Sequence, residues 1–136
     1  MVSLYVPDAN SERAVAAIPL QPVPILISSL VMLESTNAFE LRIFRGHGTR
    51  LNAAKAIRDL DADVERGVFR LQPVPASTWD VARRLSTDHS ATLGTRSLDI
   101  LQLAVAIVLR ADTFLTFDRN QAALAQAEGL QTPISL

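Results

Sequence analysis

The sequence predicts a layered α/β domain with a short parallel sheet. Short apolar runs bounded by proline, glycine or serine alternate along the chain with longer stretches of helical periodicity. This alternation is typical of parallel βαβ units. The composition, 49% hydrophobic and 20% charged over 136 residues, is sufficient for a buried core. The length corresponds to one domain, so we expect a single domain over residues 1–136.

The first half of the chain predicts three helices and two strands. Serine and threonine residues stand where helix caps are expected, and glycines stand where helices should end. The apolar runs between these predicted helices are too short to be helices themselves. They are bounded by proline, glycine or serine, as buried strands are. The predicted elements are a helix from about 12 to 18, a strand at 25–27, a helix from 28 or 29 to about 45, a helix from 49 to about 66 and a strand at 68–71.

The second half predicts three further helices and two strands. The helix at Ser97–Arg110 is apolar on almost every side, which indicates a core helix that could also contact a partner subunit. The predicted elements are a helix at 75–88, a polar loop at 88–95, this apolar helix, a strand at 113–115, a helix at 119–128 and a last short strand near 131–134.

Composition excludes several classes of protein. The chain has no cysteine, which excludes disulfides, thiolate zinc sites and a cysteine nucleophile. The net charge of −1 provides no general basic surface, so a contact with nucleic acid needs a local arginine patch or a metal. We find neither a leader-like segment nor an apolar run of the ~20 residues that span a bilayer, and we expect a cytoplasmic protein without membrane contact.

Glu34 is the first candidate site residue. Its helix carries an apolar stripe, and Glu34 borders or joins that stripe. A carboxylate that faces a core is costly unless it is paired or binds a metal. The alternative is that the side chain extends along the edge of the stripe to reach water. The predicted stripe consists of Leu30, Leu33, Asn37, Leu41 and Phe44.

Asp99 and Asp118 are the second and third candidates. Asp99 lies in the first turn of the apolar helix, and Asp118 lies where the strand at 113–115 gives way to the next helix. Ligands of open α/β sheets bind at such joints, and hard cations such as Mg²⁺ require several oxygens. Thr116 offers one more oxygen. The alternatives are that Asp99 only complements the helix dipole and that Asp118 only caps its helix.

Three segments of the chain resemble the PIN-domain family, in particular toxins of the VapC type. They are LYVPDANSE near the start, SSLVMLESTNAF, and RSLDILQLAVAIVLRADTFLTFDRNQAALAQAEGL near the end. The resemblance implies a PIN-like three-layer α/β/α domain that acts as a ribonuclease dependent on Mg²⁺ or Mn²⁺. It also implies a toxin with a cognate antitoxin, and a homodimer.

The resemblance assigns roles to particular residues. It implies that Glu34, Asp99 and Asp118 are the catalytic acids that bind the metal. It places Arg96 near the substrate phosphate and Thr116 as a hydroxyl beside the site. Metal-activated water would attack an RNA phosphodiester, while the metal and Arg96 or Arg119 neutralise the developing charge.

The N-terminus departs from the family pattern. Family members usually open with a strand that ends in an aspartate, whereas this chain opens with MVSLYV, which matches only the tail of that pattern. We therefore expect the first strand to be missing or replaced. Its place would be filled by residues 1–6 rearranged as a strand, by a segment of a partner chain, or by distortion of the sheet. Gln102 is a second departure, since many relatives carry histidine there.

One other function fits the residues, and a second can be set aside. A catalytically impaired PIN domain would serve as a dimerisation or antitoxin-binding module, in which basic residues of a peptide pair with the carboxylates. A receiver domain of the response-regulator type also has acids at strand ends. It requires a late lysine, however, and the sole lysine is Lys55, on a helix that we expect to be exposed.

Overall fold

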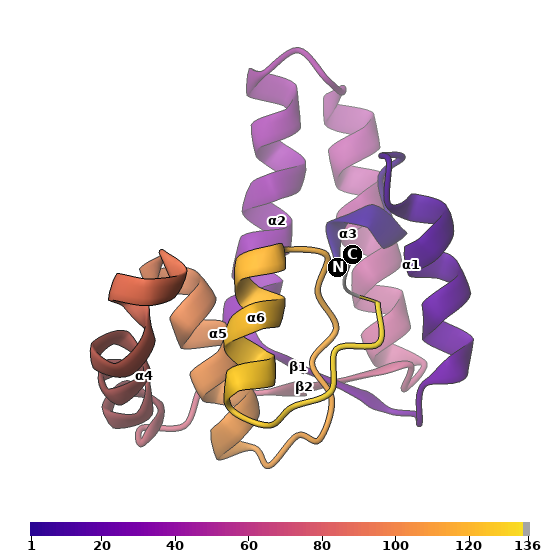
Figure 1. Ribbon diagram of the computed structural model, residues 1–136. Helices are drawn as coiled ribbons and strands as arrows, with labels where there is room; N and C mark the ends of the chain where they lie inside the picture. The colour runs from indigo at the N-terminus through magenta and orange to yellow at the C-terminus, as the bar shows by residue number, and fades with distance from the viewer. Residues whose placement is uncertain (135–136) are drawn as a thin grey trace. The chain divides into compact units, whose positions relative to one another are not determined.

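The computed structural model describes residues 1–134 (Figure 1). These residues form two compact units, 1–73 and 74–134. The first unit contains α1 (Ser11–Ala17), β1 (Ile25–Ser28), α2 (Ser29–Phe44), α3 (Arg50–Glu65) and β2 (Phe69–Gln72). The second contains α4 (Thr78–Leu93), α5 (Ser97–Val108) and α6 (Arg119–Ala127). A single domain across both units stays a prediction.

A short parallel sheet lies in the first unit. Strands β1 and β2 pair in parallel, with Ile25 opposite Phe69 and Ser28 opposite Gln72. Ile27 and Phe69 are 5% and 2% exposed and belong to the same apolar core. The sheet confirms the predicted α/β class, and both strands lie within one residue of their predicted positions.

Helices α2 and α3 run side by side and form an antiparallel hairpin (Figure 1). The Ser28 hydroxyl caps α2 by accepting the backbone N–H of Val31 at 3.3 Å. Thr49 and Asn52 form a capping box at the start of α3, in which each side chain accepts the other's backbone N–H. Both helices therefore begin where the sequence predicts, because these caps satisfy backbone donors that the first turn leaves unpaired.

The buried face of α2 differs from the predicted stripe. Its buried residues are Ser35 and Phe39, whereas Leu33 and Phe44 are 65% and 89% exposed. Phe39, at 1% exposure, packs with Ile27, Ala53, Ala56, Leu60 and Phe69. The stripe was wrong because α2 is apolar over much of its circumference, and the contact with α3 and the sheet selects the face of Phe39.

The N-terminal segment forms a short 3₁₀ helix at Val2–Leu4, so a strand over residues 1–6 was wrong. Tyr5 follows this helix and packs edge-to-face on Phe39, with ring centroids 6.1 Å apart. Its hydroxyl donates to Asp63 Oδ2 at 2.8 Å, and burial together with this bond raises the pKa of Tyr5. A turn is favoured over a strand because it brings the aromatic ring into the core of the first unit.

In the second unit, α4 continues through the predicted polar loop at 88–95. It ends at Leu93 and is closed by Gly94 in the left-handed conformation, with φ of +62°. Leu93 packs against the core, and His89 contacts Glu128. The polar residues Asp88 to Thr92 therefore belong to the last turns of α4, where Asp88 and Thr92 are exposed and His89 and Ser90 are partly buried. In the described part of the chain, none of the helices has the length and apolar character needed to cross a membrane.

The core of the second unit forms where α4, α5 and α6 meet. Its buried members include Leu85, Leu103 and Leu124, each at most 1% exposed. The apolar helix predicted at Ser97–Arg110 is largely buried, although Leu98 is 50% exposed. The prediction of a core helix is therefore confirmed for most of its circumference.

The two strands predicted near the C-terminus are reduced to one parallel bridge between Thr113 and Gln131. The Phe114 N–H donates to the Gln131 carbonyl at 2.8 Å, and the Gln131 N–H donates to the Asp112 carbonyl at 2.9 Å. Both strands were predicted too long. The ladder stops because Pro133 has no N–H to donate and the chain turns there.

Glu128 connects the end of α6 to α4. It accepts two hydrogen bonds from Arg84, at 3.1 Å from Nη1 and 2.6 Å from Nη2, and lies 2.8 Å from His89 Nε2. The Arg84 hydrogen bonds lower the pKa of Glu128. A carboxyl whose pKa falls on folding stabilises the protein above its unfolded pKa, and this stabilisation is lost as pH falls through the folded value.

Glu128→Gln is therefore expected to lower the free energy of unfolding by about 1 kcal/mol at pH 7, because Arg84 is itself partly exposed. Below about pH 4 the difference between wild type and variant should shrink. Urea denaturation at both pH values measures this. Asp88→Asn is the control, since it leaves the Arg84–Glu128 pair intact. An equal loss at both pH values would contradict the assignment.

Candidate functional site

Four predicted site residues come together in the second unit. Arg96 and Asp99 lie at the start of α5, while Thr116 and Asp118 lie just before α6. Two glutamines join them by hydrogen bonds, Gln102 of α5 and Gln121 of α6. We call these six residues the α5–α6 polar cluster.

Asp99 is the buried carboxylate of the cluster, at 7% exposure. Arg96 Nε donates to its Oδ2 at 2.8 Å, and Arg96 Nη2 lies 3.4 Å from its Oδ1. Gln121 Nε2 donates to the same Oδ1 at 2.9 Å. Asp99 lies in the first turn of α5, where it complements the helix dipole. That role alone does not explain why a side chain of another helix holds this carboxylate.

Asp118 has two different environments at its two oxygens. Oδ1 caps α6 by accepting the backbone N–H groups of Asn120 and Gln121 at 2.8 and 3.0 Å. Oδ2 lies 3.5 Å from Arg96 Nη2. The capping role that the sequence left open is therefore real, and it occupies one oxygen while the other faces a cation.

Arg96 is the cation on which both carboxylates converge. Its guanidinium contacts Asp99 and Asp118, and its side chain is 76% exposed. The position between the two carboxylates therefore favours positive charge. Its surroundings are carboxylate, hydroxyl and amide groups, whose oxygens are the donors that Mg²⁺ and Mn²⁺ prefer.

These residues fit a divalent metal held by few protein ligands. Mg²⁺ is commonly bound by one or two carboxylates, with water and substrate phosphate completing its coordination. Across residues 1–134, no three or more acidic or histidine side chains lie close enough together to hold a metal. The second unit thus offers a metal two carboxylate ligands, Asp99 and Asp118.

Glu34 and Arg119 are the two other predicted site residues. Glu34 belongs to the first unit, where it is half-buried on α2 and interacts with neighbouring groups. Its place beside Asp99 and Asp118 stays a prediction. Arg119 is exposed at the first residue of α6, and its contact with substrate also stays a prediction.

Gln121 is the residue that reasoning from the sequence missed. It is 8% exposed and contacts Asp99, Gln102 and Thr116. The sequence did contain an indication of its role, since Asp118 and Gln121 have the spacing of a capping box. A glutamine at that position normally returns to the N-cap backbone. Here the N–H of Asp118 donates to Thr116 Oγ1 at 3.0 Å, so the Gln121 side chain serves other partners.

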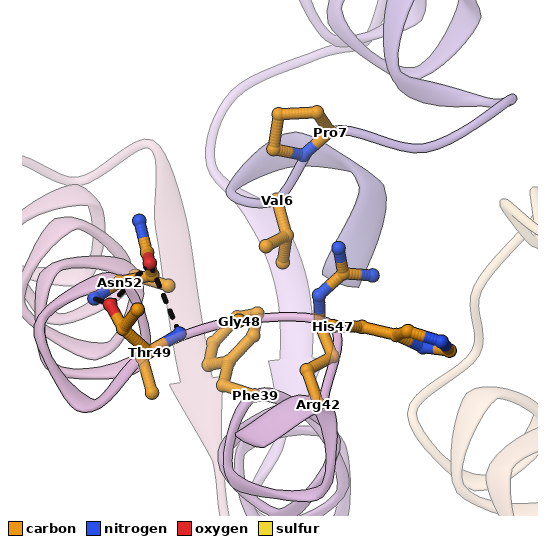
Figure 2. Close-up of a pocket in the computed structure, with 10 residues that line it drawn as sticks. Val6, Pro7, Phe39, Arg42, His47, Gly48, Thr49 and Asn52 are labelled. Carbon is orange, nitrogen blue, oxygen red and sulfur yellow. Dashed lines mark hydrogen bonds between the residues drawn. The ribbon is translucent and has the colours of Figure 1, made fainter. Parts of the chain in front are cut away.

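Two hollows lie elsewhere. One of about 260 Å³ lies in the first unit between Val6, Arg42 and the start of α3 (Figure 2). The Arg42 Nε atom there is buried and has no hydrogen-bond partner among the described residues, and the His47 side chain points away from the other labelled residues (Figure 2). The other, of about 340 Å³, lies beside Glu128 and Gln131. Within residues 1–134, neither hollow is lined by the α5–α6 polar cluster.

Comparison with known proteins gives one family. The family described as PIN domain matches residues 1–127. No curated protein matches the chain. The family match covers both units and includes every predicted site residue.

Proposed function

Because the chain belongs to the PIN-domain family, we propose that it is a metal-dependent endoribonuclease with Glu34, Asp99 and Asp118 as its acids. PIN domains are commonly metal-dependent nucleases. The observation that carries the proposal is the convergence of Asp99 and Asp118 on one cationic group, Arg96, in a cluster of oxygen donors. Mg²⁺ or Mn²⁺ is the proposed cofactor.

The charged residues of the site each have a proposed role. Asp99 and Asp118 would hold the metal through the oxygens that face Arg96 in the structure. When bound, the metal lowers the pKa of a water molecule and offsets charge on the phosphodiester. Arg96, which is largely exposed, then turns from the carboxylates toward a substrate phosphate. Arg119 adds positive charge at the N-terminus of α6, where the helix dipole also favours an anion.

The biological role proposed here is that of the toxin of a type II toxin–antitoxin pair. Its support is the resemblance of the three segments given above to toxins of the VapC type. The corresponding partners are an RNA substrate, a cognate antitoxin and a second copy of the chain. The cytoplasmic location also stays a prediction.

RNA cleavage tests the proposed activity directly. The purified protein is incubated with a mixture of structured and single-stranded RNAs in Mn²⁺, in EDTA, and in EDTA followed by excess Mn²⁺. We expect cleavage in Mn²⁺, its loss in EDTA, and its return when the metal is restored. Cleavage that is insensitive to EDTA would contradict a metal-dependent reaction, and intact RNA under all conditions would contradict nuclease activity.

A second function is favoured by the pairing of Arg96 itself. A guanidinium that contacts Asp99 and Asp118 demonstrates the chemistry by which a basic side chain of a partner peptide would bind there. The protein would then be a catalytically impaired PIN domain that dimerises or binds an antitoxin. Intact RNA, together with binding of an arginine-rich peptide that Asp99→Asn abolishes, would favour this function.

A further inference from the structure

We propose that Gln121 is a positioning residue that fixes the Asp99 carboxylate and the Thr116–Asp118 segment for metal binding. The inference rests on the proposed function, because the metal is the ligand that these groups are positioned to receive. It concerns a residue to which neither the motifs nor the resemblance gave a role.

All the polar atoms of the Gln121 amide are engaged. Nε2 donates to Asp99 Oδ1 and to Gln102 Oε1, both at 2.9 Å. Oε1 accepts from Thr116 Oγ1 at 2.6 Å. An amide nitrogen has two hydrogens, so its donor capacity is fully used by these two partners.

The direction of each hydrogen bond is determined by its neighbours. The Asp118 N–H donates to Thr116 Oγ1 at 3.0 Å, and the Thr116 hydroxyl in turn donates its hydrogen to Gln121 Oε1. An ionised Asp99 can only accept, and so it requires the nitrogen side of the amide. Rotating the amide by half a turn would place its oxygen against Asp99 Oδ1, two acceptors facing each other. A single orientation of the Gln121 side-chain amide therefore satisfies all of these connected hydrogen bonds.

These bonds link three separate parts of the second unit. Gln121 belongs to α6, Asp99 and Gln102 belong to α5, and Thr116 belongs to the segment between them. Gln121 also donates its backbone N–H to Asp118 Oδ1 at 3.0 Å. One residue thus holds both candidate metal carboxylates, and it does so through the Oδ1 atom of each, leaving the Oδ2 atoms directed at the cation position.

Because these hydrogen bonds are buried, losing one of them should be costly. Gln121, Asp99 and Thr116 are all no more than 8% exposed, so water cannot easily replace a lost partner. Without the amide, Asp99 Oδ1 would lose its 2.9 Å donor and keep the longer, 3.4 Å contact with Arg96 Nη2. Groups that hydrogen-bond to metal ligands typically contribute a factor of roughly 10–100 in metal affinity.

The test compares Mn²⁺ binding by two variants of the same helix. Gln121→Met keeps the length of the side chain and removes its hydrogen bonds. Gln126→Met is the matched control, since the Gln126 amide is exposed and donates to Thr132 Oγ1 outside the cluster. Calorimetry should give a Kd for Mn²⁺ that is roughly 10–100-fold weaker in the first variant and unchanged in the second.

Two further measurements separate positioning from a structural role. Thermal melting in EDTA reports the stability of each variant without metal. The electron paramagnetic resonance spectrum of bound Mn²⁺ reports the symmetry of its ligands, which loss of a merely structural contact would leave unchanged. If Gln121→Met does not fold, Gln121→Asn replaces it, because that amide is one methylene too short to reach Asp99.

The outcomes distinguish the inference from the proposed function. Weakened binding with an altered Mn²⁺ spectrum supports the positioning role. Wild-type affinity and spectrum in a folded Gln121 variant overturn it and leave the nuclease proposal standing. If the wild-type protein itself does not bind Mn²⁺, the metal-dependent function fails, and the inference fails with it.

Discussion

Asp99→Asn is expected to abolish metal-dependent RNA cleavage while the protein stays folded. The change removes the negative charge that the metal requires but keeps the size of the side chain. Metal ions stabilise phosphoryl transition states by several kcal/mol, so activity should fall by at least about a hundredfold. The cost to stability should be about 1 kcal/mol, because Arg96 keeps its contact with Asp118, and its side chain is 76% exposed and remains hydrated.

The measurement is the initial rate of RNA cleavage in Mn²⁺, with a urea denaturation curve for each protein. Asp112→Asn is the control, since Asp112 is an exposed acid of the same unit that lies outside the α5–α6 polar cluster. The control should cleave as the wild type does. If Asp99→Asn also retains wild-type cleavage, Asp99 is not a metal ligand and the assigned site is wrong.

Asp118→Asn is expected to weaken metal binding severely without destabilising α6. Asparagine caps helices about as well as aspartate, so the bonds to the Asn120 and Gln121 N–H groups should survive. Only the charge at Oδ2, the atom that faces Arg96, is lost. The variant therefore separates the two roles that the structure gives to one side chain.

Mn²⁺ titration and thermal melting should be carried out on Asp118→Asn and Asp118→Ala together. The alanine variant also loses the cap, and its free energy of unfolding should fall by about 1 kcal/mol. We expect both variants to lose Mn²⁺ binding and only the alanine variant to lose stability. If Asp118→Asn binds Mn²⁺ as the wild type does, Asp118 is a helix cap and not a metal ligand.

Local chemistry explains which parts of the fold were predictable. The caps Ser28, Thr49 and Asp118 begin helices at the predicted residues, because each satisfies donors within its own turn. The extension of α4 to Leu93 was missed, because it depends on packing of Leu93 and on the contact of His89 with Glu128, 39 residues away. The buried face of α2 was also missed, because an apolar helix offers several faces and tertiary contacts select one.

In the candidate site, too, locally determined features were predicted and features that depend on distant contacts were missed. Asp99, Thr116 and Asp118 were predicted at one site because helix starts and strand ends gather at one place, whereas Arg96 was placed there by the family resemblance. The structure brings these four residues together. Gln121 was missed because its side chain leaves the local capping pattern for partners on α5. The roles of all these residues in metal and substrate binding remain predictions, as does the approach of Glu34.

Paramagnetic broadening by Mn²⁺ tests the central claim most directly, because it reports the approach of all three acids to one metal. Backbone amide NMR spectra of the full chain are recorded with substoichiometric Mn²⁺, with Asp99→Asn as the control. The account predicts that signals around Glu34, Asp99 and Asp118 lose intensity together in the wild type and keep it in the variant. Broadening that spares Glu34, or that spares Asp99 and Asp118, would contradict a metal site built from these three carboxylates.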